Sequence, residues 1–447
     1  MMSGVVIDCS EKDIELETKK PARFVLTSAI GQILEWYDFF LYGTAAALVF
    51  GDLFFPVSKN PLAGTIAAYA SLALGFVARP LGGVICGYLG DKYGRKKVMT
   101  ATIALMGLST FIMGLLPNYQ QIGIAAPVIL ITLRMIQGLA VGGEWSGSIL
   151  VISENTHRSK RGFFSAMSPC GSVMGFVLSS GVFIFSQAVS GTAFNQWGWR
   201  IPFLLSIVLT IIGLYLRFTL KESADFEAIK RQDKVEKSPL IAAIKQHPKA
   251  ILTVFGLRLG EGCASWIFFA FSIAYGKYLG LSGDFILSSL TLSMFTMIPF
   301  SLLAGYMTDK YGRKTIYLAG SILALLYAYP FFLLLDTKQP GLVILALILA
   351  NGVILGLLEG AQPAFISELF PANIRYSGIG LGREISSVIG AGLAPLIATS
   401  LLATFNSAIP IAIYLGFMVL VTVITTLLAP ETYTRQQRLQ DKRLLEN

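Results

Sequence analysis

Charged residues are scarce in this sequence. Only 14% of its 447 residues are Asp, Glu, Lys or Arg, whereas 54% are hydrophobic, and the mean hydropathy is +0.66. A water-soluble fold of this length would have too little polar surface to cover itself. The composition therefore excludes an ordinary soluble domain and predicts a membrane protein.

Histidine and cysteine are rare as well. His157 and His247 lie in charged loops, and the four cysteines show neither pairing nor metal-ligand spacing. The sequence has no P-loop motif and no candidate Ser/His/Asp set. We therefore expect no disulfide framework, no metal, no cofactor and no enzymatic activity.

Long apolar runs fill most of the chain. Residues 1–20 are polar, carry both signs of charge and lack the pattern of a cleavable signal, so we expect the first apolar run to direct membrane insertion. A hydrocarbon core of about 30 Å needs roughly 20 apolar helical residues. Division on that basis predicts an all-α membrane protein with twelve transmembrane helices, at about 24–50, 65–90, 97–116, 122–151, 162–190, 199–219, 249–279, 284–308, 315–335, 341–369, 374–404 and 408–429.

A short charged loop occurs twice. Gly87–Lys97 reads GYLGDKYGRKK, and Gly305–Thr315 reads GYMTDKYGRKT. A weaker echo follows each copy at nearly the same spacing, Glu154–Gly162 (ENTHRSKRG) and Glu368–Gly378 (ELFPANIRYSG). Internal repeats of hydrophobic blocks are a mark of secondary transporters. The repeat therefore predicts a chain built from two halves.

The polar segments set the expected domain limits. We predict an N-terminal segment at 1–23, a six-helix half at 24–219, a linker at 220–248, a second six-helix half at 249–429 and a tail at 430–447. The tail has no sustained heptad pattern, so we do not expect a coiled-coil accessory domain.

Lys and Arg concentrate in alternate loops. The basic loops hold Lys92, Arg95, Lys96, Lys97, Arg158, Lys160, Arg161, Lys310, Arg313, Lys314 and Arg375, together with the linker and the tail. The intervening loops hold little more than Lys59 and Lys338. The positive-inside rule then places both termini in the cytoplasm. It also accounts for the net charge of +9 without a nucleic-acid surface.

Ten ionisable residues fall within the expected spans. They are Glu35, Asp38, Glu144, Glu261, Glu359, Glu384, Arg79, Arg134, Arg258 and Arg383. Counting helical rise from the cytoplasmic ends puts most of them roughly 12 to 20 Å deep. Charges at this depth are costly and by default face a polar cavity in the bundle. Arg383 and Glu384 lie nearer the inner end, where pairing between helices is favoured, and Glu35 fits a simple ion pair as well as a functional role.

Polar and aromatic residues accompany these charges. Arg134, Gln137 and Trp145 share one stripe of the fourth span, with Glu144 at its edge. Tyr42 lies one helical turn beyond Asp38. We include Gln137, Trp145 and Tyr42 among the candidate substrate contacts, with packing as the alternative for the two aromatic residues.

The repeated loops suggest a gate. Asp91 is placed to face the N-terminus of a neighbouring helix, and Arg95 to pair with Glu154 at the end of the fourth span. Asp309, Arg313 and Glu368 would do the same in the second half. We expect these six residues to hold one conformation of the protein and to separate in the other, with plain loop anchoring as the alternative.

The pattern resembles a known family. The twelve spans, with a GxLxDxxGRK-like loop after the second and the eighth, resemble the major facilitator superfamily across nearly the whole chain. More narrowly, five stretches resemble the metabolite:proton symporters, which include bacterial shikimate, α-ketoglutarate, citrate and proline/betaine transporters. They are Glu35–Gly43 (EWYDFFLYG), Ala78–Gly83 (ARPLGG), Arg134–Trp145 (RMIQGLAVGGEW), Trp197–Phe203 (WGWRIPF) and Lys221–Phe226 (KESADF).

The resemblance implies an inner-membrane symporter driven by the proton gradient, whose two halves rock about a central site. Carried over by motif, Asp38 and Glu144, with Glu35 beside them, are the protonatable positions. Arg79 and Arg134 are the positions for substrate or charge relay. Arg258 and Glu261 lie outside the matched stretches, and their candidacy for the site rests on burial alone.

Several alternatives stay open. Paired buried charges favour a transporter over a channel, but a passive uniporter fits the sequence too. Four buried arginines favour a carboxylate substrate, such as shikimate or a di- or tricarboxylate. Six buried acids leave room for a zwitterion such as proline or betaine, although the short tail disfavours it. We expect Arg79 or Arg258 to bind an anionic group directly, in competition with ionised Asp38 or Glu144. We expect a monomer surrounded by lipid, with protons and a small molecule as its partners and no nucleic acid.

Overall fold

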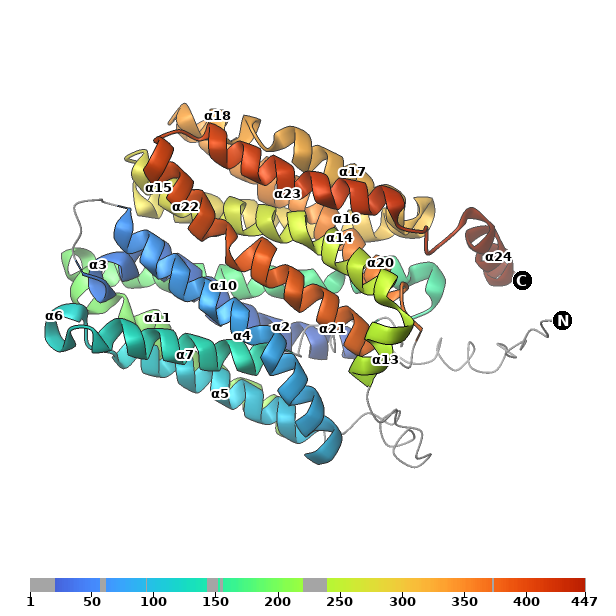
Figure 1. The fold of residues 1–447 in the computed structure, drawn as a ribbon, viewed down its shortest axis with the longest axis horizontal. Helices are drawn as coiled ribbons and strands as arrows, with labels where there is room; N and C mark the ends of the chain where they lie inside the picture. Colours follow the sequence, from blue (N-terminus) through green and yellow to red (C-terminus); the bar gives the residue numbers. More distant parts are fainter. Residues whose placement is uncertain are drawn as a thin grey trace.

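The computed structural model describes residues 21–56, 62–93, 95–142, 152, 156–219, 239–371 and 374–446. These residues form helices and connecting turns, and none of them lies in a β-strand. Figure 1 shows long helices running side by side, with the N-terminal helices in the lower part of the view and the C-terminal helices in the upper part.

The first part of the chain, up to residue 219, supplies one group of helices. Its helices are α2 (Pro21–Ala45), α3 (Gly51–Phe54), α4 (Ala63–Tyr93), α5 (Arg95–Leu115), α6 (Tyr119–Ile122), α7 (Ala125–Val141), α9 (Arg161–Ser165), α10 (Met167–Ser190) and α11 (Arg200–Thr219). Short π- or 3₁₀-helical segments join them: η1 (Ala46–Phe50), η2 (Arg158–Lys160), η3 (Gly191–Ala193) and η4 (Phe194–Gly198).

The second part begins with α13 (Pro239–Gln246), which lies within the expected linker. It continues with α14 (Pro248–Trp266), α15 (Ser272–Tyr278), α16 (Gly283–Tyr311), α17 (Arg313–Tyr327), α18 (Pro330–Asp336), α19 (Pro340–Leu347), α20 (Gly356–Ser367), α21 (Arg375–Ser386), α22 (Ala394–Phe405), α23 (Ile409–Leu428) and α24 (Arg435–Glu446). The π-helical segments η5 (Ile267–Phe271), η6 (Ile348–Leu355) and η7 (Ser387–Gly392) interrupt three of the spans.

The helices account for the twelve expected spans. Within the described ranges, eight segments are long and apolar enough to cross a membrane, one further span is a bent pair, and three shorter apolar helices complete the set of twelve. The bent pair is Arg313–Tyr327 and Pro330–Asp336, with an angle of 46°. Pro330 begins the second member, where its fixed φ suits a new helix and its ring breaks the old one.

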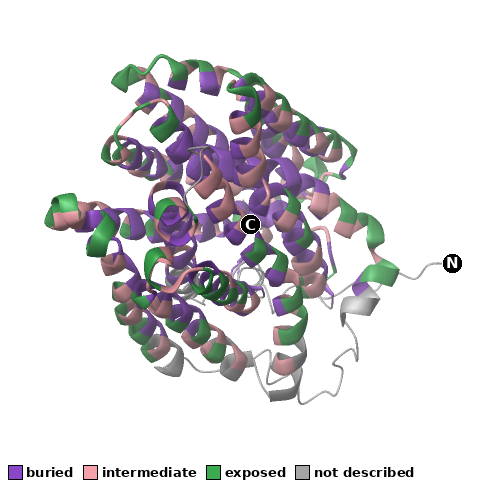
Figure 2. Ribbon diagram, turned by 60° about the vertical axis from the view of Figure 1, so that its left-hand side comes forward, coloured by how far each residue is buried: buried purple, intermediate pink, exposed green. Residues whose placement is uncertain are grey.

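The outer faces of the helices are apolar. Figure 2 shows buried residues concentrated in the interior and exposed residues along the outer helices. The exposed set includes many large hydrophobic side chains, such as Ile211 and Tyr215 on α11 and Ile413 and Phe417 on α23. Exposed apolar surface on this scale would be a liability in water and is the expected contact with lipid chains.

Glycine allows α4 and α7 to approach closely. A Cβ atom added to Gly138 would lie 2.1 Å from the backbone oxygen of Gly75, and one on Gly82 would lie 2.1 Å from the oxygen of Leu139. Small residues at such crossings bring helix backbones together in membranes. This close packing places Arg134 of α7 beside α4.

Gly312 is the glycine before Arg313 in the second copy of the repeated motif, and its backbone conformation explains why a glycine is needed there. Its φ is +109°, a backbone conformation that residues with a side chain rarely adopt. That conformation ends α16 at Tyr311 and lets α17 begin at Arg313 without a longer loop. A Cβ atom here would also lie 2.4 Å from a carboxylate oxygen of Glu431.

The glycine packing predicts a stability difference between two alanine variants. Gly138→Ala should lower stability by about 1–3 kcal/mol, because the new methyl group must displace the backbone of α4. Gly181→Ala on α10 is the matched control, since a Cβ atom there meets nothing within 4 Å. Thermal unfolding of the purified protein in detergent measures both. Equal melting temperatures for the two variants would contradict the close contact.

Candidate transport site

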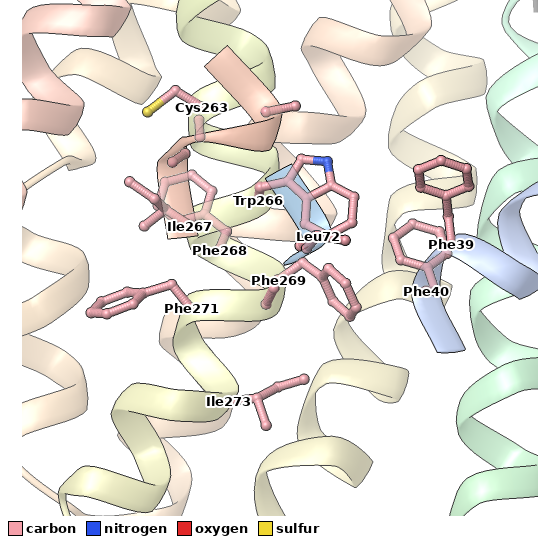
Figure 3. Packing of buried hydrophobic residues seen from close by; sticks show 14 of the residues in the cluster. Phe39, Phe40, Leu72, Cys263, Trp266, Ile267, Phe268, Phe269, Phe271 and Ile273 are labelled. Carbon is pink, nitrogen blue, oxygen red and sulfur yellow. The ribbon is translucent and has the colours of Figure 1, made fainter. Parts of the chain in front are cut away.

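The two parts of the chain meet across an aromatic cluster. Phe40 of α2 packs edge-on against Phe269 with ring centroids 4.8 Å apart, and Phe76 of α4 lies 5.2 Å from Trp266. Figure 3 shows Phe39 and Phe40 facing Trp266 and Phe269 across this boundary. The middle of the bundle is therefore closed by aromatic side chains in this conformation.

Arg79 joins the two parts of the chain by ion pairs. Its Nη2 atom lies 3.2 Å from Oε1 of Glu35 on α2, and its Nε atom lies 3.2 Å from Oε2 of Glu384 on α21. Glu384 also pairs with its neighbour Arg383 at 2.5 Å. All four side chains are almost fully buried. The simple ion pair allowed for Glu35 is therefore present, and Glu384 pairs between helices with Arg79, whereas Arg383 pairs with its neighbour on the same helix.

Arg258 has a second buried network. Its Nη1 atom lies 2.7 Å from Oε2 of Glu261, 3.7 Å from Oε1 of Glu359 and 2.5 Å from the amide oxygen of Gln362. The Gln362 amide in turn donates to Glu261 and to the hydroxyl of Tyr317, at 3.2 and 3.3 Å. Arg79 and Arg258 thus both have carboxylate partners in this structure, and their expected binding of a substrate anion stays a prediction.

Arg134 is in a different environment. Its side chain is fully buried, and its guanidinium carbon lies 4.2 Å from the ring centroid of Phe39 and 4.4 Å from that of Tyr42. Its Nη1 atom donates to the amide oxygen of Gln137. Among the described residues, Nε and Nη2 have no hydrogen-bond partner, and no carboxylate forms an ion pair with Arg134. It is a buried cation with unused donors.

Asp38 lies on α2 one turn beyond Glu35 and is also buried. The hydroxyl of Thr110 on α5 is within hydrogen-bonding reach of its carboxylate, and its charge attracts that of Arg134. A small cavity between α2, α5 and α11 is lined by Asp38, Tyr37, Gly107, Ser206 and Thr210, among others. Leu34, Ile103, Met106 and Leu209 line the rest of this cavity, so Asp38 faces a small space of mixed polarity as well as the surroundings of Arg134.

Some candidate residues are not described. Glu144, Trp145 and Glu154 lie outside the described residues. Asp91 and Arg95 belong to α4 and α5, but their side chains are not described. Their expected roles in proton coupling, substrate contact and gating stay predictions.

The second copy of the repeated loop forms a cluster with the first part of the chain. The two carboxylate oxygens of Asp309 accept hydrogen bonds from the backbone N–H groups of Gly162 and Phe163, both at 2.9 Å. Arg313 pairs with Asp309 at 2.5 Å and with Glu368 at 3.4 Å. Arg161 pairs with Glu368 from the other side, also at 3.4 Å. We call Arg158, Arg161, Asp309, Arg313 and Glu368 the latch cluster.

Residues of the C-terminal segment also contact the latch cluster. The sequence alone did not predict these contacts. Glu431 accepts a hydrogen bond from the backbone N–H of Arg313 at 2.9 Å, and Thr432 donates to Glu368 at 2.8 Å. The Arg158 guanidinium donates to the backbone oxygen of Thr432 at 3.0 Å. These contacts attach the end of the chain to both parts of the molecule.

Tyr433 packs against the arginines of the latch cluster. Its ring centroid lies 4.5 Å from the guanidinium carbon of Arg313 and 5.5 Å from that of Arg158. Its hydroxyl donates to Asp441 on α24 at 2.9 Å. Burial, with a contribution from Asp441, raises the pKa of the Tyr433 hydroxyl above its usual value, so this group stays a donor at physiological pH.

Sequence reasoning also missed three polar residues inside the spans, Thr110, Tyr317 and Gln362. Each contacts a buried charge or its partner. The only sign of these residues in the sequence was a polar side chain in the middle of a span. Hydroxyl and amide groups are common in membrane helices and many bond to their own backbone, so this sign does not identify a site residue.

Comparisons with known proteins agree with this architecture. The Major Facilitator Superfamily model matches residues 28–383 and 255–445. The shikimate transporter of Escherichia coli (strain K12) is 37% identical over 440 residues, which cover 96% of this chain and 99% of that protein. The proline/betaine transporter of the same strain is 34% identical, with 94% of this chain and 85% of that protein covered. The inner membrane metabolite transport protein YhjE, also from that strain, is 35% identical, with 92% and 94% covered.

Solved structures with the same fold include a D-xylose-proton symporter, with a TM-score of 0.70 at 20% identity over 91% of this chain and 98% of that chain. The partially occluded inward open conformation of the xylose transporter XylE from E. coli has a TM-score of 0.73 at 17% identity, over 94% and 100%. Twelve apolar helical segments with buried charges between them define a multi-pass membrane transporter rather than an enzyme. The chain belongs to the Major Facilitator Superfamily and is a metabolite transporter within it.

The latch cluster predicts a change in accessibility. Asp309→Asn should open this end of the bundle, because it removes the negative charge and replaces one of the two accepting oxygens with an NH2 donor that faces a backbone N–H group. We expect faster maleimide labelling of a cysteine introduced by Ser165→Cys, a position on α9 that is fully buried here. The measurement is labelling of the purified protein after its native cysteines have been replaced.

Asp284→Asn is the control, since Asp284 is an exposed acid at the opposite end of the same helix, α16. Unchanged labelling in Asp309→Asn would show that the cluster does not hold this end closed.

Proposed function

We propose that the protein is a proton-coupled symporter that takes up a small carboxylate through the bacterial inner membrane. Shikimate is the reference substrate, and both termini face the cytoplasm. The observation that carries the proposal is Arg134, a fully buried guanidinium with unpaired donors, held between two aromatic rings near a buried carboxylate. A planar guanidinium with free parallel donors matches the two oxygens of a carboxylate.

Proton coupling follows from the position of Asp38. An ionised Asp38 attracts Arg134 and offsets the cost of the buried positive charge. Once Asp38 takes up a proton, Arg134 is left without this anion, and a substrate carboxylate can replace it. Carrying proton and substrate together keeps the net charge of the site constant. Glu144 is a second candidate for the same role.

Alternating access is supported by contacts between the two parts of the chain. At the end opposite the latch cluster, the Tyr69 hydroxyl on α4 donates to the backbone oxygen of Ala270 at 2.6 Å. Lys277 pairs with Asp52 at 3.4 Å, although this pair is exposed and contributes little. We interpret the structure as an occluded form, in which the latch cluster is the inner gate and Tyr69 belongs to the outer one. This assignment extends to Asp91, Arg95 and Glu154 by the sequence repeat.

The alternative substrate is a zwitterion such as proline or betaine. The relative that is a shikimate transporter is 37% identical over 440 residues, and the proline/betaine transporter is 34% identical over 434 residues. This difference favours the carboxylate. Competition between shikimate and glycine betaine for binding to the purified protein discriminates between the two classes.

The role of Asp38 predicts a loss of accumulation without a loss of exchange. Asp38→Asn should abolish concentrative uptake of radiolabelled shikimate into proteoliposomes with an imposed pH gradient. Exchange of shikimate at equal pH should continue, because it needs no change in protonation. Asp284→Asn, at an exposed position in the first turn of α16, is the control and should accumulate normally. Accumulation against a gradient by Asp38→Asn would exclude Asp38 as the coupling site.

The role of Arg134 predicts a specific loss of affinity. Arg134→Lys keeps the charge but loses the second parallel donor, so shikimate should bind about 10- to 100-fold more weakly, which corresponds to the ~1.5–3 kcal/mol of a charged hydrogen bond. Binding to the native protein should also weaken as pH rises, since ionised Asp38 then competes. Calorimetry of the purified protein measures both effects.

Arg435→Lys, at an exposed position of the tail, is the control for the arginine substitution. Arg79→Lys and Arg258→Lys test the two arginines that already have carboxylate partners, and their effect on affinity should be smaller. Native affinity in Arg134→Lys, or full competition by the methyl ester of shikimate, would exclude capture of the anion by Arg134.

A further inference from the structure

A chain of hydrogen bonds connects Arg134 to Thr110, which lies close to Asp38. Arg134 Nη1 donates to the amide oxygen of Gln137, and the Gln137 amide nitrogen donates to the hydroxyl oxygen of Thr110 at 2.8 Å. The Thr110 hydroxyl is within reach of the Asp38 carboxylate. Three helices contribute, since Asp38 lies on α2, Thr110 on α5, and Gln137 and Arg134 on α7.

Thr110 has one proton and two acceptors for it. In this structure the hydroxyl donates to the backbone oxygen of Met106 at 3.1 Å, and the Asp38 carboxylate lies close enough to compete for it. A hydroxyl group donates a single hydrogen bond while its oxygen accepts others. An ionised carboxylate is the stronger acceptor, because a charge-assisted hydrogen bond is about twice as strong as a neutral one. The choice between the two acceptors therefore depends on the charge of Asp38.

Gln137 is committed to this chain. Its side chain is fully buried, and both its amide oxygen and its amide nitrogen are used, so it has no spare group for a substrate in this conformation. Arg134 has no other hydrogen bond among the described residues. The rings of Phe39 and Tyr42 cover the guanidinium, and Gly75 leaves room for it. The position of the guanidinium along these rings is thus set by Gln137.

We propose that Thr110 and Gln137 are positioning residues that transmit the protonation of Asp38 to Arg134. While Asp38 is ionised, Thr110 donates to the carboxylate, which makes its oxygen a better acceptor and holds the Gln137 amide and Arg134 in place. When Asp38 is protonated, Thr110 donates to Met106 instead. The hold on Gln137 weakens, and Arg134 is free to move toward a substrate carboxylate.

The only covalent change in this sequence is the O–H bond formed at Asp38 with a proton from solvent. Every other step exchanges one hydrogen bond for another. The inference rests on the proposed function, because it takes Asp38 as the proton site.

The other groups around Asp38 are compatible with this role. Among the described residues, the charged or titratable groups that act on it are Arg134 from α7 and Tyr37 on its own helix. Arg79 of α4 acts on Arg134. Helix α11 contributes the hydroxyls of Ser206 and Thr210 to the cavity, which do not titrate near neutral pH. Helix α10 packs on α2 through Gly175 and Phe176.

The test is substrate-free infrared difference spectroscopy of the purified protein between acid and alkaline buffer. The carboxyl band that is lost in Asp38→Asn belongs to Asp38, and the guanidinium bands lost in Arg134→Lys belong to Arg134. In the native protein the Asp38 carboxyl band and the Arg134 guanidinium bands should change together as pH is varied, with the same midpoint pH. In Thr110→Val, which has nearly the same shape without the hydroxyl, the carboxyl band should still titrate and the guanidinium change should be lost. Thr110→Ser keeps the hydroxyl and should restore it.

Gln137→Met breaks the next link with a side chain of similar length, and it carries the same expectation if Thr110→Val does not fold. Persistence of the guanidinium change in Thr110→Val or in Gln137→Met overturns the relay, as does its absence from the native protein. Lack of a titrating Asp38 band in the native protein would instead overturn Asp38 as the proton site. The failure of the relay and the failure of the proposed function are therefore distinguishable.

Discussion

Burying a guanidinium in the middle of a membrane costs free energy, and the ion pairs that offset this cost determine how the helices of this structure pack. Removing a charge from water without compensation costs several kcal/mol, and removing one partner from a buried pair costs about 3–5 kcal/mol. Arg79 meets this cost with carboxylates from two neighbouring helices, and Arg258 meets it with Glu261 on its own helix and the Gln362 amide from α20. Helix positions that the sequence leaves free, such as the rotation of α21 against α4, are fixed by these pairs.

The pair between Arg79 and Glu384 has a special position, because it crosses the boundary between the two parts of the chain. Any motion that separates α4 from α21 must break it. Glu35 keeps Arg79 neutralised on its own side, and Arg383 does the same for Glu384. Each side of the boundary thus retains a partner after separation, so the pair can hold a closed state without trapping the protein in it.

Much of the fold could be predicted from the sequence. The twelve spans follow from apolar length, and the glycine of the repeated motif is explained by the positive φ of Gly312. The capping contact of Asp309 was expected from its position before the basic residues and is present. The partners of the buried arginines could not be predicted, because depth along a helix says nothing about which face meets which neighbour. Arg79 and Arg258 were the arginines expected to bind an anionic group, yet both pair with carboxylates, whereas Arg134 has no ion pair among the described residues.

The tail shows a second limit of sequence reasoning. Its composition is that of a solvated segment, and only the folded chain brings Glu431, Thr432 and Tyr433 against Arg158, Arg313 and Glu368. These three residues follow the helix α23 and therefore leave the ribosome after all twelve spans. Every span can therefore be inserted in the membrane before the latch cluster is complete. Until the tail has been synthesised, the latch cluster lacks its contacts with Glu431, Thr432 and Tyr433. Closure of this end of the bundle is therefore complete only after the tail has been translated.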